Sequence, residues 1–114
     1  MSDCLFCRIC EGKLSATITY RDDDVIAFKD IGPKAPFHQL VIPIRHIASL
    51  VEAKAEDAAL LGKLMHVASG LAGDAGFSDS GFRVVVNAGP DAGQTVPHVH
   101  LHVLAGRSLG WPPG

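Results

Sequence analysis

The chain has 114 residues, and its 10 Lys and Arg against 12 Asp and Glu give a formal net charge of −2 at pH 7. This balance argues against a general nucleic-acid binder, and no apolar stretch reaches the ~18 residues that a membrane span needs. A hydrophobic fraction of 47% with 19% charged residues excludes a disordered chain and predicts one globular domain over residues 1–114.

The first third of the chain predicts a short helix followed by a β-hairpin. Residues 4–10 place apolar side chains at helical spacing, and Gly12 follows where helices commonly end. Residues 16–20 and 25–30 alternate in the manner of strands and flank an acidic turn at residues 21–24.

The middle of the chain predicts a third strand and then a long helix. A loop with two prolines, residues 31–36, leads to a strand at residues 37–42, which Pro43 closes. Over residues 55–71 the apolar residues change to a helical period and form a broad stripe. Residues 73–81 are rich in turn-forming residues, so the helix is expected to end before them.

Two further strands complete the prediction. They lie at residues 82–86 and 98–104, and the polar, glycine-containing segment at residues 87–94 joins them. The fold class is therefore α+β, with an antiparallel sheet of about five strands, one long helix packed on it and a short N-terminal helix. A domain of this size buries only about two-thirds of its unfolded surface, which favours association into a dimer.

The most distinctive feature is a run of alternating histidines, His98-Val-His-Leu-His-Val-Leu104. Because side chains alternate along a strand, His98, His100 and His102 are expected to share one face, ~6–7 Å apart, while the residues between them enter the core. That spacing suits three imidazoles around one phosphate or one metal ion. The alternative, an exposed face that happens to be rich in histidine, is disfavoured by the strict alternation.

Two chemistries fit such a face: metal binding by neutral imidazoles, and nucleophilic catalysis at phosphorus. The preceding loop favours the second. Its small residues and its hydroxyl allow main-chain N–H groups and an O–H to approach an anion. These residues are Gly89, Gly93, Gln94 and Thr95.

The sequence resembles the histidine triad (HIT) superfamily, whose signature alternates His with apolar residues as residues 98–104 do. The C-terminal residues 106–114 resemble its Hint branch, the nucleoside phosphoramidases, in particular. The resemblance covers most of the chain, through residues 27–36, 38–43, 46–47, 85–89 and 93–98.

The resemblance implies a HIT-like homodimer that hydrolyses the P–N bond of adenosine 5′-monophosphoramidates without a catalytic metal. Its ligands would be purine nucleotides of the AMP or GMP type and their amine conjugates. His100 would be the nucleophile that forms a nucleotidyl-histidine, and His98 would orient it. His102 and His38 would flank the α-phosphate. Thr95 stands where most of the branch has Ser and keeps the hydroxyl.

The resemblance also implies a nucleotide pocket. Asp30 would bind the ribose hydroxyls, although an Asp before Ile-Gly also commonly caps a turn. Lys29 stands where Hint proteins often have His, so the base preference is expected to shift. The base pocket, whose residues would otherwise be plain core, would consist of Leu5, Phe6, Ile9, Phe28 and Ile31. The phosphate side would add Asn87, Gly93, Gln94 and Thr95.

The cysteines suggest a second site. No secretory signal is visible, so the chain is expected to be cytoplasmic and its thiols reduced. Cys4 and Cys7 form a C-x-x-C on the short helix, and by resemblance His46 and His98 complete the Cys2His2 structural zinc site of many bacterial-type HIT proteins. Hint proteins usually lack these cysteines. The alternative is a pair of buried thiols behind the base pocket, which is the expectation for Cys10.

Two alternative functions stay open at this stage. One is a dinucleoside polyphosphate hydrolase of the same superfamily, but those enzymes usually have Gln at the position of His102. The other is a nucleotide-binding regulatory module with little catalysis, which the intact triad disfavours. His66 lies in no motif and is expected to be a surface or core histidine.

Overall fold

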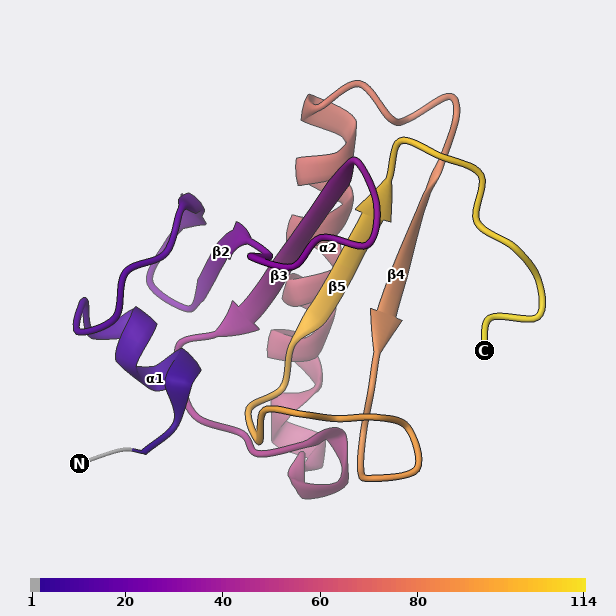
Figure 1. Cartoon of the computed structure of the whole chain (residues 1–114). Coiled ribbons are helices and arrows are strands. Elements are labelled where there is room, and N and C mark those ends of the chain that lie inside the picture. Colours follow the sequence, from indigo (N-terminus) through magenta and orange to yellow (C-terminus); the bar gives the residue numbers. More distant parts are fainter. Residues whose placement is uncertain (1–2) are drawn as a thin grey trace.

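The computed structural model describes residues 3–114, and these form a five-stranded sheet between two helices (Figure 1). In chain order the elements are α1 (Leu5–Cys10), β1 (Ile18–Arg21), β2 (Val25–Lys29), β3 (Phe37–Pro43), the 3-10 turns η1 (Leu50–Glu52) and η2 (Ala55–Asp57), α2 (Ala58–Asp74), β4 (Phe82–Val86) and β5 (Leu101–Ala105). All pairings are antiparallel, in the order β1-β2-β3-β5-β4. The predicted α+β class is confirmed.

Both faces of the sheet are covered by a helix, and strand β2 shows the effect on burial. Its side chains point alternately into two separate hydrophobic clusters. Val25 and Ala27 pack with α2, while Ile26 and Phe28 pack with α1. All four are buried, as expected for alternating side chains on a strand with a helix over each face. In Figure 1 the long helix α2 lies behind β3 and β5, and α1 lies at the end of the sheet near the N-terminus.

The last strand is shorter than predicted. The expected strand at residues 98–104 begins only at Leu101, so His98 and His100 precede it. The local reason is that the groups that would extend the ladder bind elsewhere: the Val99 N–H donates to the Ile47 carbonyl at 2.7 Å, and the Pro43 carbonyl lies 2.7 Å from Nε2 of the His98 ring. Strand β5 consequently pairs with β3 only from the level of Leu101 onward.

The long helix is displaced toward the C-terminus relative to the prediction. Residues 55–57 form the 3-10 turn η2, and α2 continues to Asp74, two residues into the segment 73–81 that was expected to be turns. Burial of Ala72 in the core on α2 stabilises this last turn despite the poor helix propensity of the glycines around it. Gly76, with φ of 91°, then ends the helix in the left-handed conformation that glycine tolerates.

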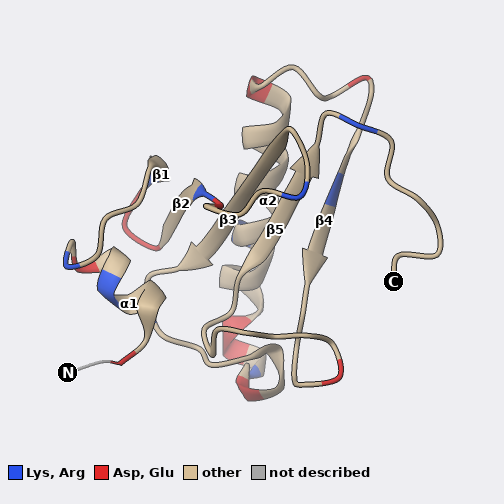
Figure 2. Cartoon of the chain, viewed as in Figure 1, with Lys and Arg blue, Asp and Glu red and all other residues tan. Residues whose placement is uncertain are grey.

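Charged residues of both signs occur in most parts of the described chain. Lys and Arg are interspersed with Asp and Glu along the chain (Figure 2). Within residues 3–114, no helix has the length and apolar character needed to cross a membrane.

Candidate active site

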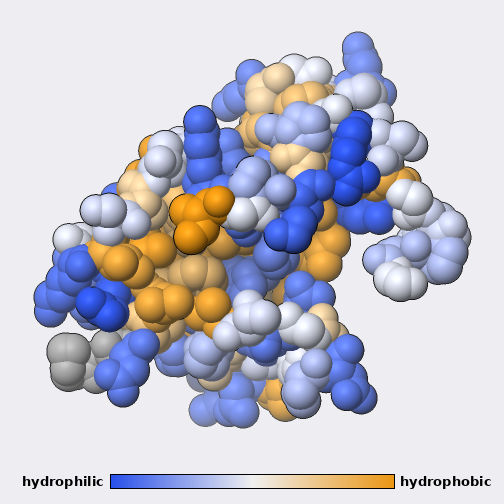
Figure 3. Space-filling view, viewed as in Figure 1, coloured by the Kyte–Doolittle hydropathy of each residue, from blue (hydrophilic) through white to orange (hydrophobic). Residues whose placement is uncertain are grey.

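A cavity of about 340 Å³ opens between α1, the end of β2 and the segment that leads into β5. Apolar side chains gather on this part of the surface, around α1 and the neighbouring end of β2 (Figure 3). The structure brings all five expected base-pocket residues to its wall, and Lys29, which the resemblance connects with base preference, lies there too. The wall also contains residues that the sequence did not indicate: Leu14, Ser15, Ala16, Leu40 and Val96. The polar lining includes Asp30, Thr95, His100 and His102, besides Ser15 and Lys29.

The apolar wall is a packed surface with an open rim. Phe6 and Phe28 are buried and meet edge to face, with ring centroids 5.5 Å apart. Together with the buried Ile9 they also belong to the hydrophobic core under α1. These three residues therefore contribute both to the core and to the cavity wall. Leu5 and Ile31 are 47% and 101% exposed and form the rim. A flat apolar ligand entering here would therefore meet a preformed wall.

His100 is held in a single orientation by the main chain. Its Nδ1 lies 2.7 Å from the carbonyl oxygen of His98, and because a carbonyl only accepts, Nδ1 carries the hydrogen. The ring is buried and packs edge to face on Phe6 at 5.1 Å. With hydrogen on Nδ1, the neutral imidazole keeps a lone pair on Nε2, the form that a nucleophilic histidine requires.

His38 and His102 form a second ordered pair. The Lys34 N–H donates to His38 Nδ1 at 3.0 Å, so the hydrogen of the neutral His38 ring is on Nε2. That nitrogen lies 2.9 Å from His102 Nδ1 and 3.5 Å from Oδ2 of Asp30. His102 accepts at Nδ1 and therefore carries its own hydrogen on Nε2. Each ring thus carries its hydrogen on Nε2, but only His102 lines the cavity, so His38, which was expected to flank the phosphate, supports His102 from behind the lining.

Burial disfavours the charged form of both of these rings. It lowers the pKa of His38, against the opposing effect of the Asp30 carboxylate. It also lowers the pKa of His102 to about 4, with smaller contributions from His100 and His38. The ring centroids of His100 and His102 are 5.1 Å apart, closer than the ~6–7 Å expected for one strand face.

The three triad histidines lie on the α1 side of the sheet, as the alternation predicts, because Phe6 packs on the rings of both His98 and His100, while Val99, Leu101 and Val103 enter the core with α2. His98 nevertheless does not line the cavity with His100 and His102. Its ring is completely buried and is absent from the cavity lining. Nδ1 lies 3.4 Å from Cys4 Sγ and 3.5 Å from Cys7 Sγ. Only the carbonyl of His98 reaches the active site, through His100.

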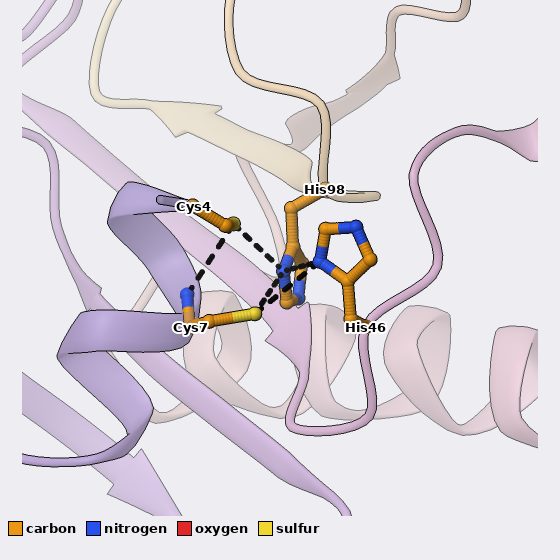
Figure 4. A group of neighbouring side chains, drawn as sticks. All are labelled: Cys4, Cys7, His46 and His98. Carbon is orange, nitrogen blue, oxygen red and sulfur yellow. Dashed lines mark hydrogen bonds between the residues drawn. The ribbon is translucent and has the colours of Figure 1, made fainter. Parts of the chain in front are cut away.

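The expected Cys2His2 cluster is assembled. Cys4 and Cys7 come from the start of α1, His46 from the loop after β3, and His98 from the segment before β5 (Figure 4). Their four ligand atoms lie within 4.8 Å of one another. His46 Nδ1 is 3.2 Å from Cys7 Sγ and 3.2 Å from His98 Nδ1.

These distances match the edges of a zinc tetrahedron. Zn–N bonds of about 2.0–2.1 Å and Zn–S bonds of about 2.3 Å give edges of about 3.3 Å between two nitrogens and about 3.6 Å between nitrogen and sulfur. The Nε2 of His98 lies 2.7 Å from the Pro43 carbonyl and donates to it, which leaves the Nδ1 lone pair facing the cysteines. The donor set, its spacing and this outer contact fit a structural zinc ion.

The loop residues expected near the phosphate are separated by the structure. Thr95 is exposed and lines the cavity. Asn87 instead donates to the Ala92 carbonyl at 2.7 Å. Gln94 accepts from the Gly89 N–H at 3.0 Å and donates to the carbonyls of Ala48 and Val96 at 2.7 and 3.0 Å. Asn87, Gly93 and Gln94 lie outside the cavity lining, so their contact with a phosphate stays a prediction.

Asp30 uses its two carboxylate oxygens differently. Oδ1 accepts the Gly32 N–H at 2.7 Å, which is the turn cap that the sequence also allowed. Oδ2 faces His38, and the residue lines the cavity. The turn cap therefore holds the carboxylate at the cavity and leaves lone pairs for a ligand.

Two remaining expectations agree with the structure. Cys10 is buried outside the cluster, and burial raises the pKa of its thiol to about 11. His66 is exposed on α2.

Comparison with known proteins agrees with this architecture. The HIT domain family matches residues 11–109. An uncharacterised HIT-like protein of Synechococcus elongatus is 49% identical over 112 residues, 98% of this chain and 97% of that protein. A similar protein of Synechocystis is 47% identical over the same length, with the same coverage.

Solved structures give the same result. A HIT family hydrolase from Legionella pneumophila superposes with a TM-score of 0.96 at 44% identity, covering 98% of this chain and 100% of that one. A histidine triad protein from Clostridium difficile gives 0.93 at 41% identity, covering 96% of each chain. With its histidine run inside the matched region, the chain belongs to the HIT, or histidine triad, family.

Proposed function

We propose that this protein is a purine nucleoside phosphoramidase of the Hint type, which hydrolyses the P–N bond between a nucleoside 5′-monophosphate and an amine. The observation that carries the proposal is the fixed tautomer of His100, whose Nδ1–H is bound by the His98 carbonyl and whose ring lines the cavity. A hydrolase is also the class named for its structural neighbour from Legionella pneumophila.

The reaction follows from the protons at the site. The Nε2 lone pair of His100 attacks phosphorus, the P–N bond breaks, and its electron pair leaves with the amine, which takes up a proton. Water then adds to phosphorus, loses a proton and displaces His100 Nε2, which releases AMP. The Nε2–H of His102 and the hydroxyl of Thr95 are hydrogen donors that line the cavity. They stabilise the charge on the phosphoryl oxygens as it develops.

The remaining lining suits the nucleoside. The wall made by Phe6, Ile9 and Phe28 accepts a purine, and Leu5 and Ile31 lie at its rim. The Asp30 carboxylate, fixed by Gly32, accepts hydrogen bonds from ribose hydroxyls. An AMP- or GMP-type nucleotide and its amine conjugates are therefore the proposed ligands.

Product release from a panel of adenosine 5′-monophosphoramidates tests the proposal. Wild type and His66→Ala, a matched loss of an exposed histidine, should release AMP, whereas His100→Ala should be slower by on the order of 10⁴-fold or more with its fold retained. Undiminished turnover by His100→Ala would refute the nucleophile. Turnover of a dinucleoside polyphosphate alone would favour that hydrolase class, and AMP binding without any turnover would favour a regulatory module.

We also propose that the Cys4, Cys7, His46 and His98 cluster holds a structural zinc ion. Zinc there would crosslink α1, the loop after β3 and the segment before β5, and its four protein ligands would leave no open position for catalysis. Elemental analysis of protein purified without chelators should find about one zinc ion per chain. A zinc content near zero would contradict this assignment.

A homodimer is the proposed assembly. Strand β4 is at the edge of the sheet and pairs only with β5, so one side of its main chain is available for another strand. Its first residue, Phe82, is 37% exposed, and Met65 on α2 is 58% exposed. Light scattering should give twice the mass of one chain. A single-chain mass at every concentration tested would exclude the dimer.

A further inference from the structure

Arg107, two residues after the end of β5, makes a specific contact that the proposed chemistry does not use. Its guanidinium donates to the Lys34 carbonyl through Nε at 3.1 Å and through Nη2 at 2.8 Å. A third bond, from Nη1 to the Ser108 carbonyl at 3.0 Å, fixes the side chain against its own turn. Lys34 is 73 positions away in the sequence, so this contact ties two distant segments together.

The neighbouring glycine docks the same two segments. A Cβ on Gly106 would lie 2.9 Å from the Cβ of Pro36, and its φ of 96° is in the region that favours glycine. The turn after β5 and the loop before β3 are therefore in contact at two points, the Gly106–Pro36 approach and the Arg107–Lys34 hydrogen bonds.

Lys34 connects this contact to the active site. Its N–H donates to His38 Nδ1 at 3.0 Å, while its carbonyl accepts from Arg107. Because Pro33 and Pro36 have no N–H, few main-chain donors in this loop are available for His38. Arg107 holds the Lys34 carbonyl, and the position of Lys34 thus decides whether His38 Nδ1 has a main-chain donor.

The donor at His38 Nδ1 determines the hydrogens of both rings. While Lys34 donates, His38 carries hydrogen on Nε2 and presents it to His102 Nδ1 at 2.9 Å. His102 must then carry its hydrogen on Nε2. If the Lys34 N–H moves away, His38 is free to carry its hydrogen on Nδ1, and His102 can place its own hydrogen on Nδ1 and lose the donor at Nε2.

We propose that Arg107 is a positioning residue, which fixes the Nε2–H tautomers of His38 and His102 through the main chain of Lys34. The tautomer part of this inference stands on the hydrogen bonds alone. Its consequence for turnover rests on the proposed function, because a phosphoryl group needs the Nε2–H of His102 as a donor.

Three variants test the inference. Arg107→Ala removes the contact, Arg107→Lys keeps a cation without the two-point geometry, and Arg83→Ala is the matched control. Arg83 also donates to main-chain carbonyls near the C-terminus, those of Gly110 at 2.7 Å and Leu109 at 3.4 Å. Neither of these carbonyls belongs to the loop before β3.

The first measurement is ¹⁵N NMR of the histidine rings in the full chain at neutral pH. Wild type and Arg83→Ala should show His38 and His102 as Nε2–H tautomers, and Arg107→Ala should show averaged signals for both. The second measurement is turnover of an adenosine phosphoramidate. Arg107→Ala should lower kcat by roughly 3- to 30-fold with KM within about 2-fold of wild type, and Arg107→Lys should recover part of the loss.

Each outcome decides a separate point. Histidine signals in Arg107→Ala that equal those of wild type would overturn the inference, whatever the activity. Altered signals with an unchanged kcat, in a chain whose wild type is active, would overturn the catalytic consequence. If wild type turned over no phosphoramidate, the proposed function would fail, and the NMR result alone would still decide whether Arg107 sets the tautomers.

Discussion

The molecule contains two clusters of histidine side chains, and the imidazole nitrogens have different roles in each. Around Cys4, Cys7, His46 and His98 the four potential ligand atoms converge, within 4.8 Å of one another. Around Asp30, His38 and His102 the atoms are equally close, but each contact pairs a hydrogen with an acceptor. The first arrangement is compatible with a metal ion between its members, whereas the second is already hydrogen-bonded and leaves the Nε2–H of His102 as its remaining donor.

The main chain creates this difference. His98 donates through Nε2 to the Pro43 carbonyl, so its Nδ1 keeps a lone pair and is available to a metal ion. His38 accepts at Nδ1 from the Lys34 N–H, so its Nε2 is a donor. The partner of the second nitrogen therefore decides what the first nitrogen can do. His98 also links the two groups, because its carbonyl orients His100.

Removing a thiolate should give the largest effect, and only on the first group. Cys7→Ser should weaken zinc binding by on the order of 10³-fold, because one of four ligands is lost. Competition with a chromophoric chelator measures this affinity. Cys10→Ala is the control, since Cys10 is buried outside the cluster and its loss should leave the zinc affinity unchanged. Equal effects of the two substitutions would mean that the metal, if any, is bound elsewhere.

The matching change in the second group is His102→Ala. It should lower kcat by about 10²–10³-fold, the cost of one donor to a developing charge, while the zinc content stays at that of wild type. Steady-state kinetics and elemental analysis of the same preparation check both statements. A loss of zinc in this variant would mean that the two groups are not chemically separate.

The regular parts of the fold were predictable because local pattern determines them. The strand over residues 82–86 was predicted with the bounds that β4 has, and the hairpin, the short helix and the long helix were all present in the periodicity. The start of β5 was not predictable. It depends on the bonds from Val99 to Ile47 and from His98 to Pro43, which join residues far apart in the sequence.

The site shows the same limit. Alternation correctly placed the three triad histidines on one side of the sheet, but it could not show that the His98 ring contacts the two cysteines and is absent from the cavity lining. His38 and His46 were identified as site residues only through the family resemblance, because neither lies in a local motif. Arg107 gave no signal at all, and its partner Lys34 is 73 positions away.

Acid should distinguish the two groups through stability. The pKa of His102 is about 4, lowered first by burial and then by His100 and His38, against about 6.5 in an unfolded chain. The unfolded chain therefore takes up a proton that the native ring refuses, so stability should fall as pH decreases from about 6.5 to about 4, by on the order of 3 kcal/mol.

Urea unfolding of wild type and His102→Gln at both ends of this range isolates the ring. The variant cannot titrate at this position and should lose less stability toward acid. Protonation of the metal ligands is common to both proteins and cancels in the difference. Equal losses in the two proteins would show that the native His102 ring accepts a proton as readily as the unfolded one.

The smallest expected effect is that of Asp30→Asn, which keeps the shape of the side chain and the oxygen that caps the turn at Gly32. Loss of the charge should weaken AMP binding by roughly 10-fold, because hydrogen bonds from ribose hydroxyls to a carboxylate become bonds to a neutral amide. Calorimetric titration with AMP measures the change. The zinc content should stay at that of wild type, because Asp30 belongs to the cluster with His38 and His102 and not to the cysteine cluster. Unchanged AMP affinity would reduce Asp30 to a turn cap, whereas a loss of zinc would place the metal in the second group and remove the contrast between the two.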